Sequence, residues 1–324
     1  MRKRQLGFTD AELTTIGLGT WAIGGPWQFG WGPQDDDLSV ATISRALDLG
    51  INWIDTAPAY GLGHSEEMVG RATSGRRREV FIATKCGRVW DDIAEPKVYG
   101  RLKSDSIRAE AESSLTRLKT DVIDLYQIHW PDPDEDIEEA WEEIARLVEE
   151  GMVRYAGVSN FSVEQIKRVS KIHPVASLQP PYSMLRREVE KELLDYCLQN
   201  EIGVVVYSPM QAGMLTGKFT REWVSSLAKD DWRRRDDRFK EPALTANLKL
   251  VERLGKIARR SGRTVAELAI AWVLRRSAVT AAIVGARRPD QIEETSPAAD
   301  WELTGAEIDE IEELLALHEA GAVA

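Results

Sequence analysis

Apolar and polar positions follow two spacings along the chain, and these predict strands and helices in turn. Eight short runs are rich in β-branched and aromatic residues and end at turn residues, as buried strands do. Between them, apolar residues recur at positions i, i+3 and i+4, the spacing of one helix face. The predicted strands are residues 14–20, 51–55, 80–85, 122–129, 153–159, 175–179, 203–208 and 281–285. The predicted helices are residues 37–50, 65–74, 104–118, 136–151, 162–172 and 188–200.

This alternation is typical of consecutive βαβ units that build a parallel sheet. Eight strands with interleaved helices favour a closed (β/α)8 TIM barrel, and we predict that residues 1–324 form one such domain. Residues 4–13 predict a small N-terminal hairpin, and residues 304–318 predict an extra capped C-terminal helix. A doubly wound open sheet is the alternative, because it shares the alternation and differs only in strand count and closure.

Residues 209–245 interrupt the alternation. They form a long, charged segment rich in Trp and Arg, where a compact barrel needs only a few residues to connect two elements. Long loops of this kind commonly carry function, so we predict a functional loop here.

Composition and charge narrow the possible partners. The chain has 42 Lys and Arg against 53 Asp and Glu, a net charge of −11, which argues against a general binder of nucleic acid. The basic N-terminus lacks a following apolar region, and no apolar run is long enough to span a membrane. We therefore expect a cytoplasmic protein. Cys86 and Cys197 lie far apart, and the four histidines lack HxH or HExxH spacing, so neither a disulfide framework nor a metal site is expected.

Polar residues follow nearly every predicted strand. Asp55 and Tyr60 follow the second strand, Lys85 ends the third, and His129 ends the fourth. In a (β/α)8 barrel the carboxyl ends of all strands meet on one face, so these four residues should share a pocket. Taken singly, each has an ordinary structural explanation as a turn residue, a packed ring, an ion pair or a core histidine. Their occurrence on three successive strands favours catalysis.

Together these side chains suit proton donation to a carbonyl oxygen. A phenol has an ordinary pKa of about 10, and a nearby ammonium group is expected to lower that pKa. Lys85 would supply the charge, and Asp55 would keep Lys85 charged and oriented. His129 would hydrogen-bond the substrate oxygen or take part in a proton relay.

Several ordered motifs carry a family resemblance over residues 14–295. These are GLGTW, IDTAPAYG with HSEEMVGRA, IATK, DLYQIHWPDP, GVSNFS, YSPMQAGMLTGK and the GAR and QIEE segments near residue 290. The chain resembles the aldo-keto reductases, and is similar to their bacterial NADPH-dependent branch. The resemblance implies an enzyme that reduces aldehydes and ketones reversibly with NADPH, acts on small molecules, and is a monomer or weak oligomer.

The resemblance also implies residue roles. Asp55, Tyr60, Lys85 and His129 correspond to the catalytic tetrad, with Tyr60 as the general acid in reduction. Relatives that reduce carbon–carbon double bonds have Glu in place of this His, so His129 indicates carbonyl reduction. For the cofactor, the positions that bind the nicotinamide carboxamide or stack on its ring are Ser159, Asn160, Gln179 and Tyr207.

Further cofactor contacts are implied in the carboxyl-terminal part. Ser208, Gly213, Leu215 and Lys218 match a pyrophosphate-binding stretch, where small residues let backbone amides approach an anion. Arg287 matches the ligand of the adenosine 2′-phosphate of NADPH, at the start of a predicted helix. The other expected cofactor contacts are Thr20, Trp21, Asp55, Pro209, Gly217, Gly285, Gln291 and Glu294. The expected substrate-pocket residues are Trp21, Tyr60, Trp90, His129 and Trp130.

Two other interpretations of the sequence are alternatives to an aldo-keto reductase enzyme. Gly17, Gly19 and Ala22 spell GxGxxA after a strand, but no helix follows that could receive a dinucleotide pyrophosphate. The second alternative is an NADPH-binding regulatory protein of aldo-keto reductase fold with slow turnover. A complete tetrad does not exclude it.

Overall fold

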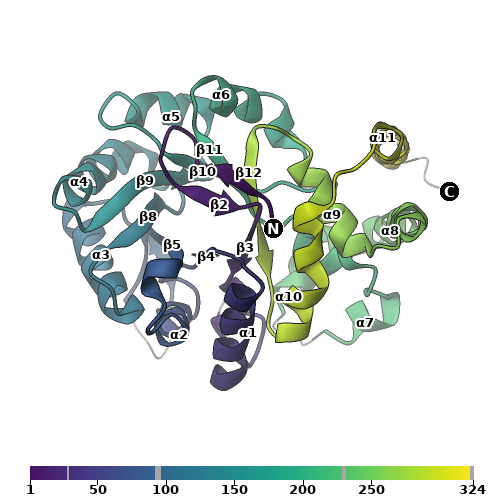
Figure 1. Ribbon diagram of the computed structural model, residues 1–324, viewed down its shortest axis with the longest axis horizontal. Coiled ribbons are helices and arrows are strands. Elements are labelled where there is room, and N and C mark those ends of the chain that lie inside the picture. The colour runs from purple at the N-terminus through teal and green to yellow at the C-terminus, as the bar shows by residue number, and fades with distance from the viewer. Residues whose placement is uncertain (28, 92–95, 228–230, 322–324) are drawn as a thin grey trace.

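The computed structural model describes residues 1–27, 29–91, 96–227 and 231–321. Eight parallel strands close into a barrel in the order β10, β11, β12, β3, β4, β5, β8, β9 (Figure 1). Closure brings the last strand beside the first, with Val284 in register with Leu18. The predicted TIM barrel is confirmed, and the doubly wound sheet is excluded. The strands are β3 (Ile16–Gly19), β4 (Trp53–Asp55), β5 (Phe81–Cys86), β8 (Ile123–Ile128), β9 (Val153–Ser159), β10 (Ser177–Gln179), β11 (Gly203–Val206) and β12 (Val279–Gly285).

Helices surround the barrel (Figure 1), and several of them bury one face of the helix. In α4 the buried residues include Ile137, Trp141 and Ile144, spaced three or four apart as one helix face requires. Several helices begin at a capping box, including α9 at Thr264 and α11 at Thr304. The helices are α1 (Asp36–Asp48), α2 (His64–Ala72), α3 (Ser104–Leu118), α4 (Ile137–Glu149), α5 (Val163–Val169), α6 (Leu193–Gln199), α7 (Arg221–Ser225), α8 (Ala243–Arg260), α9 (Val265–Leu274), α10 (Pro289–Thr295) and α11 (Gly305–Glu319).

The N-terminal hairpin closes the end of the barrel opposite the strand exits. Strands β1 (Lys3–Gln5) and β2 (Glu12–Thr14) pair antiparallel, as predicted. Leu6 and Leu13 of this hairpin join the apolar residues that fill the barrel interior, among them Trp53 and Val205. Gly17 is required here, because a Cβ at this position would lie 2.0 Å from the Trp53 ring. This glycine therefore makes room for the core.

Three parts of the fold were not predicted from the sequence. Strands β6 (Arg88–Trp90) and β7 (Val98–Gly100) form a second hairpin directly after β5. Two helices, α8 and α9, follow one another in the sequence between β11 and β12, and α8 packs beside α11. The segment 209–245 holds α7 and the short 3₁₀ helices η5 (Gln211–Thr216), η6 (Trp232–Arg235) and η7 (Asp237–Phe239), with residues 228–230 outside the described part.

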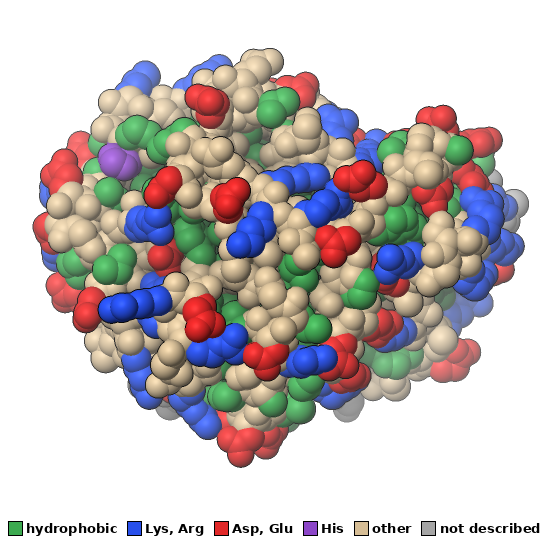
Figure 2. All heavy atoms as spheres, viewed as in Figure 1, with side chains coloured by type: hydrophobic (Ala, Val, Ile, Leu, Met, Phe, Trp, Pro, Cys, Tyr) green, Lys and Arg blue, Asp and Glu red, His purple; other side chains and the backbone are tan. Residues whose placement is uncertain are grey.

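Acidic and basic side chains are interspersed on the face seen in Figure 2. Among the described residues, no helix is both long and apolar enough to cross a bilayer.

Candidate active site

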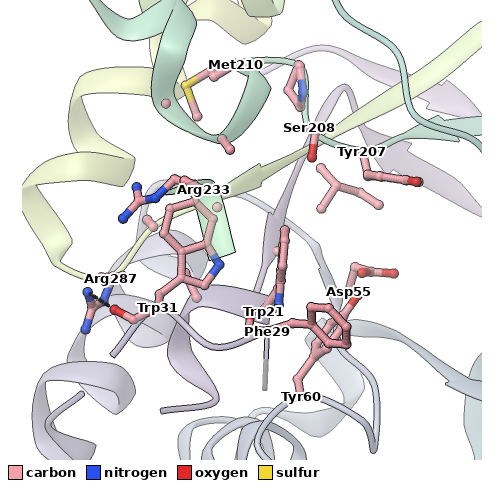
Figure 3. A pocket seen from close by; sticks show the side chains of 18 of the residues that line it. Trp21, Phe29, Trp31, Asp55, Tyr60, Tyr207, Ser208, Met210, Arg233 and Arg287 are labelled. Atoms are coloured by element: carbon pink, nitrogen blue, oxygen red, sulfur yellow. Dashed lines mark hydrogen bonds between the residues drawn. The ribbon is translucent and has the colours of Figure 1, made fainter. Parts of the chain in front are cut away.

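A cavity of about 870 Å³ opens at the carboxyl ends of the barrel strands. Asp55, Tyr60 and His129 line one part of it, and Arg287 and Glu294 line another. The long segment 209–245 contributes to its wall, with Arg233 next to the cavity (Figure 3). Residues far apart in the sequence therefore meet in one groove, as the strand ends predict.

A buried ion pair lies beneath the cavity. Lys85 Nζ is 2.7 Å from Asp55 Oδ1, and the two side chains are 0% and 3% exposed. Lys85 Nζ also donates to the carbonyl of Thr56 at 2.9 Å. The other carboxylate oxygen, Asp55 Oδ2, accepts from Gln179 Nε2 at 2.7 Å. Each charged atom of this pair thus has a partner, which a charge removed from water requires.

The Tyr60 ring is close to both Lys85 and His129. Lys85 Nζ is 5.0 Å from the centre of the Tyr60 ring, and the His129 ring packs edge-on to it with centres 5.8 Å apart. The pKa of Tyr60 is raised well above its ordinary value, because burial and the Asp55 carboxylate both disfavour the phenolate. The expected lowering of the Tyr60 pKa by Lys85 is therefore wrong, because burial and the Asp55 carboxylate that holds Lys85 both oppose ionisation of the phenol.

The pKa values of His129 and Lys85 are both lowered, which favours their neutral forms. Burial, with Lys85 and Arg88 nearby, lowers the pKa of His129 well below its ordinary value, so the imidazole is neutral at pH 7. Burial also lowers the pKa of Lys85, and the Asp55 carboxylate counteracts this effect. The cavity therefore presents a neutral phenol and a neutral imidazole.

A tight turn positions Tyr60. Gly61 has a positive φ of 66°, and a Cβ there would lie 1.8 Å from the carbonyl oxygen of Gly24. Behind the turn, the Thr20 hydroxyl donates to the carbonyl of Asp55 at 3.0 Å and accepts from the Ser65 hydroxyl at 2.7 Å. Thr20 is fully buried by these contacts and does not line the cavity, although a cofactor contact was expected of it. It ties η1 (Trp21–Ile23) to β4 instead.

The four expected nicotinamide contacts lie together beside Asp55 and all line the cavity. Asn160 donates to the carbonyl of His129 at 3.0 Å and accepts from the Tyr207 hydroxyl at 2.9 Å. Ser159 donates to the backbone carbonyl of Gln179 at 2.9 Å. Asn160 has a positive φ of 63°, a conformation that costs energy for most residues and is often found at functional sites.

The expected cofactor contacts between residues 208 and 218 divide into two groups. Ser208 and Gly213, with positive φ values of 56° and 94°, line the cavity together with Pro209 and Lys218. Lys218 forms an ion pair with Glu294 in this structure. Leu215 is fully buried and does not line the cavity, and Gly217 faces a separate depression. Neither position is exposed to the predicted groove.

At the far part of the cavity, Gly285, Arg287 and Gln291 lie around the start of α10. The Arg287 backbone N–H donates to Gln291 Oε1 at 2.7 Å. The side chain of Arg287 turns toward the segment before α1 and lines the cavity.

Aromatic residues line the rest of the cavity, and only some of them were predicted from the sequence. Trp21 and Trp130 line it as expected, whereas Trp90 does not. Trp21 packs against Trp31 and stacks on Trp232, both with ring centres 5.4 Å apart. The strand-end rule missed residues that come from the segment after η1, from the second hairpin and from the long loop: Trp27, Phe29, Trp31, Arg88, Val98, Trp223 and Arg233.

Known proteins resemble this chain in sequence and in fold. The sequence model of the Aldo/keto reductase family matches residues 15–316. The chain belongs to the aldo-keto reductase family. Aldo-keto reductase YhdN of Bacillus subtilis is 41% identical over 318 residues, covering 97% of this chain and 94% of that protein. The NADH-specific methylglyoxal reductase of Escherichia coli is 36% identical over 322 residues, covering 95% and 96%.

A solved structure also resembles this aldo-keto reductase closely. The glycerol dehydrogenase of Gluconobacter oxydans superposes with a TM-score of 0.90 at 40% identity, covering 98% of this chain and 95% of that chain. The predicted family is confirmed, and with it an oxidoreductase that acts on small carbonyl compounds and uses a nicotinamide cofactor. One relative is named NADH-specific, so the family assignment leaves the choice between NADPH and NADH open.

Proposed function

We propose that this aldo-keto reductase reduces small aldehydes and ketones to alcohols with NADPH, and that it catalyses the reverse reaction as well. The proposal rests on the meeting of Tyr60 and His129 above the buried pair of Asp55 and Lys85. When bound, the nicotinamide supplies or accepts the hydride, which no side chain provides.

The residues present fit a dinucleotide. Beside Tyr60, Asn160 and the Gln179 side chain offer amide groups for a carboxamide. Along the groove, the positive φ of Ser208 marks backbone of the kind that can turn amides toward an anion. At the far part, the Arg287 guanidinium offers a cation for the 2′-phosphate of NADPH.

In the direction of reduction, Tyr60 donates its proton to the carbonyl oxygen as that oxygen gains charge. Its raised pKa keeps the phenol protonated before the reaction. The neutral His129 can donate a hydrogen bond to the same oxygen. Once the phenolate forms, Lys85 Nζ, 5.0 Å from the ring centre, offers it a compensating charge.

The test replaces Tyr60 with Phe and measures turnover and cofactor binding separately. Because a positioned general acid contributes roughly 10²- to 10⁴-fold, kcat/KM for a panel of small aldehydes should fall by at least about 100-fold. The Kd for NADPH, measured by calorimetry, should stay within about 2-fold. Tyr99→Phe is the matched control, because Tyr99 is an exposed residue of the second hairpin and bonds only Asp91 among the described residues.

Each result of this test is informative. Turnover that persists in Tyr60→Phe would show that another group is the acid. A parent protein that binds NADPH but turns over no aldehyde, ketone or sugar would instead favour the regulatory alternative.

A further inference from the structure

The guanidinium group of Arg287 is held by the segment that leads into α1, residues 29–35. Arg287 Nε donates to Gln34 Oε1 at 2.8 Å, Nη1 donates to the carbonyl of Trp31 at 2.9 Å, and Nη2 donates to the carbonyl of Pro33 (Figure 3 shows the Trp31 contact). In return, Gln34 Nε2 donates to the backbone carbonyl of Arg287 at 2.9 Å. All three guanidinium nitrogens therefore donate to this segment.

These contacts limit what Arg287 can offer a phosphate. A guanidinium has five N–H groups, and its strong phosphate contacts use two neighbouring N–H groups at once. With Nε, Nη1 and Nη2 each already donating, a 2′-phosphate must use the remaining N–H groups or displace one of the acceptors. Among the acceptors, the Gln34 side chain is the one that a substitution can remove.

Arg287 remains available to an anion, unlike the two arginines beside it. Its neighbours Arg288 and Arg233 are paired with Asp290 and Asp231, whereas Arg287 has no carboxylate partner within the described part of the chain. Burial and the charges of Arg233 and Arg288 lower its pKa, which indicates a positive potential around it. An added negative group would be favoured at this place.

Gln34 is not needed to start the helix that follows. Asp35 is the N-cap of α1, and its side chain accepts from the backbone N–H of Leu38 at 2.8 Å. Both side-chain hydrogen bonds of Gln34 within the described residues go to Arg287. The side chain of Gln34 thus acts on Arg287 and not on the helix.

We propose that Gln34 determines how strongly this protein distinguishes a 2′-phosphorylated dinucleotide from an unphosphorylated one, by competing with the phosphate for Arg287. The inference rests on the proposed function. Because Gln34 binds Arg287, the preference for NADPH should be weaker than it would be with a free arginine side chain. The residue that controls this preference therefore lies outside the strand ends.

The experiment titrates the parent, Gln34→Ala and Gln34→Glu with NADPH and with NADH, and measures Kd by calorimetry. For Gln34→Ala, the Kd for NADPH should fall about 3- to 10-fold, because one competing acceptor of the guanidinium is gone. For Gln34→Glu, the Kd for NADPH should rise at least about 10-fold, because a carboxylate pairs with Arg287 and repels the phosphate. The Kd for NADH should stay within about 2-fold in both variants.

Two controls isolate the effect. Gln199 is an exposed residue at the end of α6, so Gln199→Ala and Gln199→Glu repeat the same changes away from the cavity and should leave both Kd values unchanged. In an Arg287→Ala background, Gln34→Ala should no longer alter the Kd for NADPH.

Two outcomes would overturn the inference alone. If the parent binds both dinucleotides and no Gln34 substitution changes either Kd value, Gln34 does not compete for Arg287. Equal changes for NADPH and NADH would show that Gln34 only supports the segment. A parent that binds neither dinucleotide would overturn the proposed function itself.

Discussion

Removing only one charge of the buried pair of Asp55 and Lys85 should lower the free energy of unfolding more than removing both charges together. In Asp55→Asn, the new amide has one acceptor end for two donors, Lys85 Nζ and Gln179 Nε2, which now bind separate carboxylate oxygens. In Lys85→Met, the carboxylate stays buried without its counter-charge. The double variant Asp55→Asn/Lys85→Met leaves no buried charge without a partner, because both members of the pair are neutral.

The size of the effect follows from burial. Because the side chains are 0% and 3% exposed, each single variant should cost about 3–5 kcal/mol of unfolding free energy. For a chain of 324 residues, an unfolding entropy of roughly 2.1 cal/mol/K per residue converts this to a loss of about 4–7 °C in Tm. The double variant should lie within about 1 kcal/mol of the parent or above it, since replacing both charges is often neutral.

Thermal and urea unfolding of the four proteins measure these differences directly. The matched control is the exposed pair of Lys240 and Asp237, 49% and 95% exposed, where Lys240→Met and Asp237→Asn should each shift Tm by about 1 °C or less. Two results would refute this prediction. One is an Asp55→Asn variant with the same Tm as the parent, and the other is a double variant destabilised by the sum of the two single effects.

Three further changes test other parts of the structure. Arg287→Ala should raise the Kd for NADPH about 10- to 150-fold and leave NADH nearly unchanged in calorimetric titrations; equal losses would contradict a role in reading the 2′-phosphate. Burial raises the pKa of Glu110, which accepts from the Gly87 backbone N–H, to about 7. The folded state therefore retains its proton above the ordinary pKa of 4.5, so stability should fall by about 3 kcal/mol as pH rises from 4.5 to above 7. Glu110→Gln should remove that slope in urea unfolding, and an unchanged slope would contradict it. Gly61→Ala should abolish aldehyde reduction, because its Cβ would overlap the Gly24 carbonyl beside Tyr60, and near-normal kcat/KM would refute this.

The barrel and the central part of the site could be predicted because both follow from local patterns. Burial on both faces makes barrel strands short apolar runs, and helix faces repeat every three or four residues, so elements can be found within windows of about ten residues. The rule that strand ends share one face then brings Asp55, Tyr60 and His129 together without further information. The second hairpin was missed because Arg88–Trp90 and Val98–Gly100 are too short to show a period.

What only the tertiary structure decided are interactions between groups that no local pattern connects. Arg287 and Gln34 are 253 residues apart, and their contact depends on how the first and last strands close the barrel. The raised pKa of Tyr60 likewise depends on its burial and on its distance from the Asp55 carboxylate, which no local pattern in the sequence gives. Sequence periodicity thus determined which elements form and which ends they share. Packing determined which hydrogen-bond donors have partners and in which direction each pKa is shifted. Hydrogen bonds and electrostatic energies vary over distances much shorter than a secondary-structure element.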